Sequence, residues 1–238
     1  MKKLDFIGIG VTRSGTTWTW QQLKKHPQTC LLQTRKEAQI LIKNTAEIIK
    51  KFFGSCDNNQ FIGEYTPTYL QKPEIIIPKI KRYFPDAKLL LMLRNPLDRI
   101  FTQYKALQWK KFGKPKQRFK DWFDNNSLRG TVDYVGSNNY MDYLPYWSDL
   151  SHNLKINFYE DIINDPLEYI QDIYDFVGLN RDFVPPKYWI RESKPYNDYY
   201  DANPIEMSKA DRSHVKKYYY KSIAKLEKYL KKDTGWLD

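Results

Sequence analysis

An apolar strand at the start of the chain runs into a glycine-containing loop and then into a helix, an order that few folds share. The stretch covers residues 6–18 and reads FIGIGVTRSGTTW. Such a junction directs several backbone N–H groups to one place, where the helix dipole also favours negative charge. We therefore expect a phosphate-binding loop. For the loop alone, a glycine-rich turn without a ligand is the alternative.

The spacing within the loop differs from that of the usual nucleotide-binding motif. Gly10 and Gly15 fit the glycines of G-x-x-x-x-G-K-[ST], but Thr16 stands at the lysine position and the nearest cation is Arg13. A P-loop kinase or ATPase would need that lysine and a strand-end aspartate for Mg²⁺, so the sequence disfavours both. A second anion-binding segment is needed to decide the function.

Strands and helices are expected to alternate along the chain. The strands are predicted at residues 5–9, 60–65, 88–93 and 154–159, and the helices at 17–25, 37–53, 72–83, 96–109 and 166–177. This alternation predicts an α/β fold with a central, mainly parallel sheet flanked by helices, like that of P-loop NTPases, in a single domain over residues 1–238. Ligands bind such sheets beyond the carboxyl ends of the strands, where the first loop lies.

Two stretches lack a long helical period, residues 113–139 and 185–204. We expect both to be irregular, either as lids over a site or as ordinary surface connections. A final helix is expected at residues 208–231, and the Trp236–Leu237 pair that follows it is expected to pack back on the domain.

The chain is basic. Its 39 Lys and Arg against 28 Asp and Glu give a net charge of +11, which should attract anions, although a solvated basic surface is the alternative. Cys30, Cys56 and the three histidines show no metal-ligand spacing, so no metal is expected. No stretch is apolar for long enough to form a signal peptide or membrane anchor, so the expectation is a cytoplasmic protein without a membrane partner.

A second anion-binding segment follows the strand expected at residues 88–93. It reads RNPLDRIFTQY and begins at Arg94, with Asn95 placed to cap a helix and Pro96 in its first turn. Arg94 should lie on the same rim as the first loop, and Thr102 stands eight residues further on. An arginine beside a hydroxyl suits a phosphate monoester. Two such sites on one rim predict a nucleotide with phosphates at both ends.

Together the two motifs resemble those of sulfotransferases that use 3′-phosphoadenosine 5′-phosphosulfate (PAPS). The matching segments are TRSGTT at 12–17, HP at 26–27, KE at 36–37, GEYTPTY at 63–69, RNPLDR at 94–99, FYED at 158–161, DP at 165–166 and the closing helix with Trp236. Their order is most similar to that of the branch containing heparan sulfate sulfotransferases and many bacterial relatives. The resemblance covers most of the chain.

The resemblance implies a role for each anion-binding segment. The residues implied for the 5′-phosphosulfate are Arg13, Ser14, Gly15, Thr16 and Thr17, and those implied for the 3′-phosphate are Arg94 and Thr102. The branch usually carries lysine where this chain has Arg13. Because arginine stays protonated, Arg13 is assigned to electrostatic stabilisation rather than to proton donation. The implied reaction is in-line transfer of the sulfuryl group from PAPS to a hydroxyl or amine, with a carbohydrate as the favoured acceptor and a small alcohol as the other.

A base is needed to take the acceptor's proton, and the resemblance implies a carboxylate. Glu37 matches the base of the heparan sulfate branch and is the first choice, with a carboxylate at a helix N-terminus as the alternative. Glu64 is the competing carboxylate, and a structural pairing with Arg13 or Arg35 is its alternative. Tyr65 replaces a lysine common in the glycan enzymes, and we assign Glu64 and Tyr65 to acceptor binding.

Less regular segments are also implied near the nucleotide. The stretch from Gly136 through Tyr140 to Trp147 resembles a region beside the nucleotide and acceptor, which makes Tyr140 a candidate substrate contact. Ser193 and Lys194 are candidates to close over the phosphates. A catalytically inactive nucleotide- or nucleic-acid-binding module on the same fold is the alternative to an enzyme. The enzyme is favoured because two specific motifs tie the basic residues to strand ends, whereas nucleic-acid binders show a basic stripe.

Overall fold

The computed structural model describes residues 3–32, 36–43, 45–113, 115–128, 135–188 and 206–238. It divides into two compact units, one formed by Met1–Leu93 with Tyr146–Lys194 and the other by Arg94–Pro145 with Pro195–Asp238. Each unit is described by itself. The expectation of a single domain over residues 1–238 stays a prediction.

The first unit holds a five-stranded sheet in which every adjacent pair of strands is parallel. The strands are β1 (Phe6–Gly10), β2 (Thr29–Cys30), β3 (Phe61–Tyr65), β4 (Lys88–Leu93) and β5 (Leu154–Phe158), in the order β2-β3-β1-β4-β5. β1 therefore lies in the centre, where the order of the strands switches direction. This confirms the predicted α/β class. The carboxyl end of a strand at such a switch point is where open α/β sheets bind ligands.

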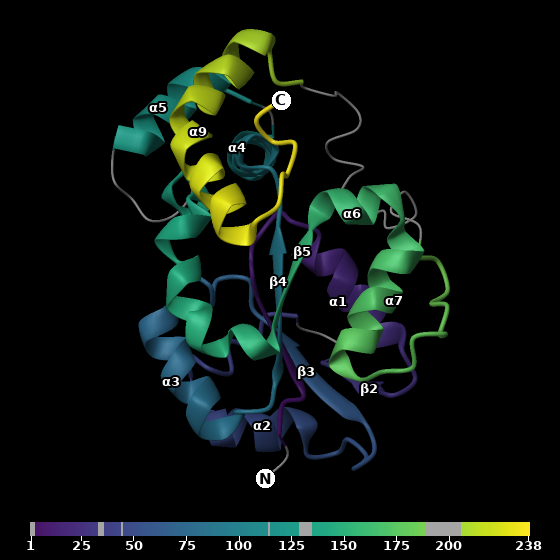
Figure 1. Cartoon of the computed structure of the whole chain (residues 1–238). Helices are drawn as coiled ribbons and strands as arrows, with labels where there is room; N and C mark the ends of the chain where they lie inside the picture. The colour runs from purple at the N-terminus through teal and green to yellow at the C-terminus, as the bar shows by residue number, and fades with distance from the viewer. Residues whose placement is uncertain (1–2, 33–35, 44, 114, 129–134, 189–205) are drawn as a thin grey trace. The chain divides into compact units, whose positions relative to one another are not determined.

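Helices cover both faces of this sheet. They are α1 (Thr16–Lys25), α2 (Thr45–Phe53), α3 (Pro73–Tyr83), α6 (Tyr159–Asn164) and α7 (Pro166–Val177). Figure 1 shows α1 and α7 on one side of the sheet and α3 on the other. Leu90 and Met92 of β4 pack with Leu23 of α1 and Ile173 of α7 in one buried cluster. Burial on both faces explains why β4 is an uninterrupted apolar run rather than an alternating one.

The helix predicted at residues 37–53 begins only at Thr45, so the first part of that prediction is wrong. Residues before it form turns, and Gln39 has a positive φ of 57°. The backbone N–H of Gln39 donates to Glu64 Oε1 at 3.1 Å, and that of Leu41 donates to the Tyr69 hydroxyl at 3.0 Å. These bonds to the segment 64–69 take the place of helical ones.

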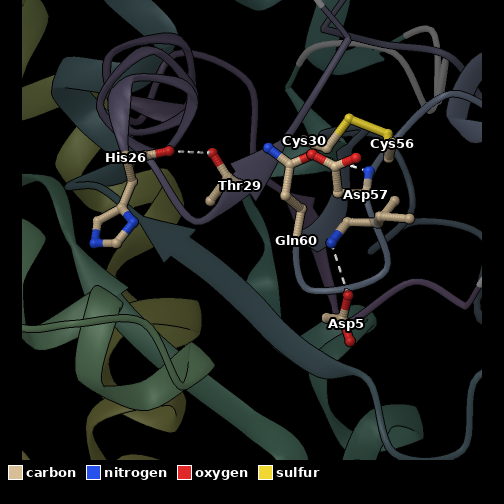
Figure 2. Close-up of a disulfide and its surroundings, with 8 residues drawn as sticks. Asp5, His26, Thr29, Cys30, Cys56, Asp57 and Gln60 are labelled. Atoms are coloured by element: carbon tan, nitrogen blue, oxygen red, sulfur yellow. Dashed lines mark hydrogen bonds between the residues drawn. A yellow bond between two sulfur atoms is a disulfide. The ribbon is translucent and has the colours of Figure 1, made fainter.

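A disulfide joins Cys30, at the end of β2, to Cys56, which follows α2. Figure 2 shows the bond with Thr29 beside it, whose hydroxyl donates to the His26 carbonyl at 2.9 Å. The two cysteines are 26 residues apart, and the segment between them contains the KE pair at residues 36–37. The bond therefore restrains both ends of the segment that carries the predicted base. Neither this bond nor the short strand β2 was predicted from the sequence.

The second unit is helical. Its elements are α4 (Pro96–Phe112), α5 (Phe119–Leu128), the 3-10 helices η1 (Gly136–Asn138) and η2 (Tyr140–Asp142), and α9 (Lys209–Leu230); η3 (Leu144–Asn153) begins in this unit and continues into the first. Aromatic rings fill the core of this unit. The ring centroids of Phe119 and Tyr104 of α4 lie 5.2 Å apart, and those of Phe123 and Tyr219 of α9 lie 6.0 Å apart. The stretch 113–139, predicted to be irregular, thus contains a helix, because Phe119, Trp122 and Phe123 share one buried face.

The end of the chain follows the prediction closely. Ser208 caps α9 by accepting the backbone N–H of Asp211 at 3.1 Å. Trp236 is buried, and the centroid of its ring lies 6.3 Å from the centroid of the Tyr140 ring. Most of the segment 185–204 falls outside the described residues. None of the helices within the described ranges is both long and apolar enough to cross a bilayer.

Candidate functional site

The loop after β1 is shaped by two residues in the left-handed region. Arg13 has a φ of 65° and Gly15, which caps α1, a φ of 79°. A Cβ on Gly15 would lie 2.5 Å from Ile162 Cδ1, so only glycine fits there. The backbone N–H of Val11 donates to the Met92 carbonyl at 2.9 Å, which fixes the start of the loop beside β4. The first turn of α1 consequently begins at the rim of the sheet, as predicted, with its N–H groups available to an anion.

Ser14 lies in the middle of this loop. Its side chain is fully buried, and its hydroxyl has no hydrogen-bond partner among the described residues. Leaving a buried hydroxyl unpaired costs free energy, so such groups are normally satisfied by a partner. An oxygen of a polar ligand at this loop would satisfy the orphaned hydroxyl.

Lys36 reaches the same loop from the segment after β2. Its ammonium donates to the hydroxyls of Thr16 and Thr17 at 3.0 and 3.1 Å. Burial lowers the pKa of Lys36 to about 8; the charge of Glu37 opposes this shift, and the charge of Arg13 adds to it. Lys36 is not among the site residues predicted from the sequence. The only signal was its place in the KE pair, because its contact with α1 is tertiary.

Glu37 is half exposed, and its carboxylate lies 3.7 Å from the Lys36 ammonium. It lies in an irregular segment eight residues before the start of α2, so the helix-terminal alternative for Glu37 is wrong. Its exposure leaves the carboxylate accessible from solvent. The carboxylate is thus close to the cation that contacts the first turn of α1.

Glu64, at the end of β3, is buried. Its Oε1 accepts from the hydroxyls of Thr66 and Tyr69 and from the backbone N–H of Gln39, whereas Oε2 has no partner among the described residues. These contacts hold the turn that carries Glu37 against the end of β3. The geometry therefore favours a structural role for Glu64. Of the two cations considered as its partners, Arg35 lies outside the described residues.

Burial raises the pKa of Glu64 from 4.5 to about 7, so Glu64 makes stability depend on pH. A folded-state pKa above the unfolded one means that this contribution is greatest below 4.5, falls as pH rises towards 7, and is constant above it. The fall is of the order of 3 kcal/mol. We expect Glu64→Gln to remove this fall in the free energy of unfolding with rising pH. Denaturant unfolding of both proteins from about pH 5 to about pH 8 measures the difference, with exposed Glu74→Gln as control. Equal pH slopes in wild type and Glu64→Gln would contradict this assignment.

Tyr65 was assigned to acceptor binding, but its side chain is fully buried in the core cluster with Leu90 and Met92. The Lys36 ammonium lies 5.7 Å from the centroid of its ring. A cation near an aromatic ring is attracted to the ring's negative face. The structure thus makes Tyr65 the apolar support beneath Lys36.

The other predicted anion site lies in the second unit, which begins at Arg94, directly after β4. Asn95 caps α4 as expected, accepting from the backbone N–H of Leu97 at 3.0 Å. The Thr102 hydroxyl donates to the Asp98 carbonyl at 2.8 Å, so it must turn from that carbonyl to bind a phosphate. Tyr140 is buried, and its hydroxyl donates to the Arg94 carbonyl at 2.7 Å, which fixes the backbone of Arg94.

Arg99, the second arginine of the RNPLDR motif, is buried and structural. Its guanidinium donates to the Ser137 carbonyl at 3.0 Å and to Asn138 Oδ1 at 2.6 Å. It ties α4 to the segment that contains Tyr140. Ser193 and Lys194, the remaining predicted contacts, lie outside the described residues. In the ranges that the structure describes, no group of three or more His, Cys, Asp or Glu side chains could hold a metal ion.

A parallel α/β sheet whose central strand leads through a glycine-containing loop into a helix defines a P-loop-like fold. Comparison with known families narrows this class. Residues 3–187 match the family described as Sulfotransferase domain. The match covers more than half of the chain, which therefore belongs to the sulfotransferase family, as its motifs suggested.

Solved structures share this fold. A sulfotransferase from Alicyclobacillus acidocaldarius has a TM-score of 0.80 at 20% identity, with 100% of both chains covered. Mouse sulfotransferase SULT7A1 complexed with PAP has a TM-score of 0.50 at 16% identity, covering 90% of this chain and 63% of that one. At these identities the likeness concerns the fold alone.

Curated relatives also match by sequence. Membrane-associated sulfotransferase kil1 of Dictyostelium discoideum is 35% identical over 46% of this chain, and human heparan sulfate glucosamine 3-O-sulfotransferase 6 is 25% identical over 79% of it. The chain spans only 24% and 56% of their respective lengths. The family assignment does not favour the alternative of a nucleic-acid-binding module.

Proposed function

We propose that this protein is an enzyme that transfers the sulfuryl group of PAPS to a hydroxyl or amine acceptor. The observation that carries the proposal is the group of cations at the first turn of α1. Lys36 donates to Thr16 and Thr17 there, and its pKa is lowered in part by the positive charge of Arg13. Two cations that repel each other beside a helix N-terminus favour an anion.

The residues present suit a phosphosulfate. The hydroxyl of Ser14 is buried without a described partner, and an anionic oxygen would satisfy it. The N–H groups at the start of α1 and the Arg13 guanidinium supply further donors for the 5′ end of the donor molecule. Arg94 and Thr102 remain our proposal for its 3′-phosphate. When bound, PAPS supplies the activated sulfuryl group, and the protein supplies orientation and charge.

The assigned roles follow the demands of an in-line transfer. Glu37, half exposed, accepts the proton of the acceptor. Arg13 and the N–H groups of Ser14 to Thr17 stabilise the charge that develops on the leaving phosphate. The buried Tyr65 and Glu64 shape the site from below instead of contacting the acceptor, which replaces the acceptor-binding role expected for them.

A carbohydrate is the acceptor class that we favour. The supporting observations are the match of 79% of the chain to a heparan sulfate glucosamine 3-O-sulfotransferase and the net charge of +11, which would attract an acidic polysaccharide. A small alcohol or phenol is the other acceptor within the proposal. Assays should therefore include desulfated heparan sulfate and p-nitrophenol as probes of the two classes.

The cellular location is a separate part of the proposal. The sequence alone led to the expectation of a cytoplasmic protein. The bond between Cys30 and Cys56 points elsewhere, because disulfides persist in oxidising compartments and are rare in the cytosol. We therefore propose that the enzyme works in an oxidising compartment.

Replacing Arg94 by Ala tests the donor assignment. We expect adenosine 3′,5′-bisphosphate (PAP) to bind wild type far more tightly than AMP does. The variant should lose about tenfold to a hundredfold in PAP affinity, the worth of charge-assisted hydrogen bonds, with little change for AMP. Calorimetric titration measures both, and Arg82→Ala, an exposed arginine of α3, is the control. No preference for the 3′-phosphate in wild type would refute the proposed donor.

A further inference from the structure

We propose that Lys36 is the second cation of the phosphosulfate site and gives a proton to the leaving 5′-phosphate oxygen, an inference that rests on the proposed function. Arg13 cannot take this role, because a guanidinium stays protonated throughout the useful pH range. A lysine can take it, since an ammonium releases its proton when its surroundings disfavour the charge.

The position of Lys36 carries the argument. Thr16 occupies the place of the lysine in the common phosphate-binding motif, and the Lys36 ammonium lies 3.0 Å from the hydroxyl of that same residue. The chain thus brings an ammonium to the first turn of α1 from a segment about twenty residues further along. The side chain is only 13% exposed, so its cation is held beside the loop rather than in solvent.

The groups around Lys36 explain why it can donate. The acidic neighbour is Glu37, at 3.7 Å, the cationic one is Arg13, and the ring of Tyr65 lies 5.7 Å from the ammonium. Glu64 on β3 accepts hydrogen bonds from Thr66, Tyr69 and Gln39. Burial and the charge of Arg13 together lower the pKa of Lys36 to about 8 despite the carboxylate of Glu37. An acid with a pKa near neutrality is effective in general acid catalysis.

With Glu37 as the base and Lys36 as the acid, the protons of the transfer balance. The bond from sulfur to the bridging oxygen breaks with its electrons left on that oxygen, and sulfur forms a bond to the acceptor oxygen. Glu37 takes the acceptor's proton and Lys36 gives one to the bridging oxygen, leaving a carboxylic acid and a neutral amine. A proton passed from Glu37 to Lys36 across their 3.7 Å separation restores both charges. The product PAP carries the donated proton into solution.

Binding calorimetry tests the inference without any acceptor. At about pH 8, titration of PAP in buffers of different ionisation enthalpy should show proton uptake by wild type, because the bound anion raises the pKa of Lys36. Lys36→Arg and Lys36→Met should show none. Lys36→Met should also bind PAP about tenfold to a hundredfold more weakly, while Lys36→Arg keeps most of the affinity. Lys43→Met, an exposed lysine of the same segment, should behave like wild type.

Kinetic measurements distinguish the effect of the positive charge of Lys36 from the effect of the proton that it donates. With desulfated heparan sulfate as acceptor, kcat/KM of wild type should fall above about pH 8, and Lys36→Arg should lose this limb and have a lower kcat. Equal proton uptake in wild type and Lys36→Arg, or equal PAP affinity in Lys36→Met and Lys43→Met, would overturn the inference while the proposed function stands. Failure of wild type to bind PAP would overturn both.

Discussion

Glu37→Gln is expected to lower kcat for sulfuryl transfer by about 10² to 10⁴, the usual contribution of a general base, with PAP affinity unchanged. The amide has nearly the same shape as the carboxylate but cannot take the acceptor's proton. The side chain is half exposed and pairs with the Lys36 ammonium at 3.7 Å. Steady-state transfer from radiolabelled PAPS to desulfated heparan sulfate measures kcat, and calorimetry measures PAP binding.

The control for Glu37 is Glu74→Gln, on the exposed first turn of α3, which should retain full activity. Binding of PAP separates loss of catalysis from loss of the donor site. If Glu37→Gln kept the wild-type kcat, Glu37 would not be the base. Glu64→Gln would then be the next variant to measure.

Removing the disulfide is expected to lower the free energy of unfolding by about 3 to 4 kcal/mol. The estimate follows from the chain entropy of the unfolded state, since the bond closes a loop between cysteines 26 residues apart. The double variant Cys30→Ser with Cys56→Ser should show this loss in denaturant unfolding. Mass spectrometry after alkylation under native conditions should find no free thiol in the wild-type protein.

A reductant provides the matched control for this prediction. Reduced wild type should unfold at the same denaturant concentration as the double serine variant, and the variant itself should not respond to the reductant. The restrained segment carries Lys36 and Glu37, so transfer activity should fall along with stability. Oxidised wild type and the variant unfolding together would show that the bond contributes nothing.

Much of the fold could be predicted because its signals are local. The apolar run of β4, the Asn95 cap with Pro96, and the left-handed Gly15 each depend on neighbours within a few residues. For the same reason the segment 37–53 was predicted to be helical as a whole. Its first part is not helical because Gln39 and Leu41 bond to β3 and the residues after it, partners more than twenty residues away.

The candidate site was only partly predictable. The loop after β1 and the segment that begins at Arg94 were predicted from the order of strand, turn and helix, and the roles of Arg13 to Thr17, Arg94 and Thr102 from the resemblance to sulfotransferases. The structure places the loop at the central strand, as expected. The burial of Glu64 and Tyr65 could not be read from spacing, because a residue at a strand end can face either solvent or core. Neither could the contact of Lys36 with α1, which joins two segments through side chains.

The sequence by itself determined the unit of β1, loop and α1 and the capped start of α4, because glycine conformation, apolar runs and helix caps act over a few residues. The tertiary structure alone decided the turn that holds Glu37, the ammonium of Lys36 at Thr16 and the bond between Cys30 and Cys56. These features join segments distant in the chain. Their geometry follows from how the whole unit buries its apolar surface and pairs its polar groups, which no short window of sequence contains.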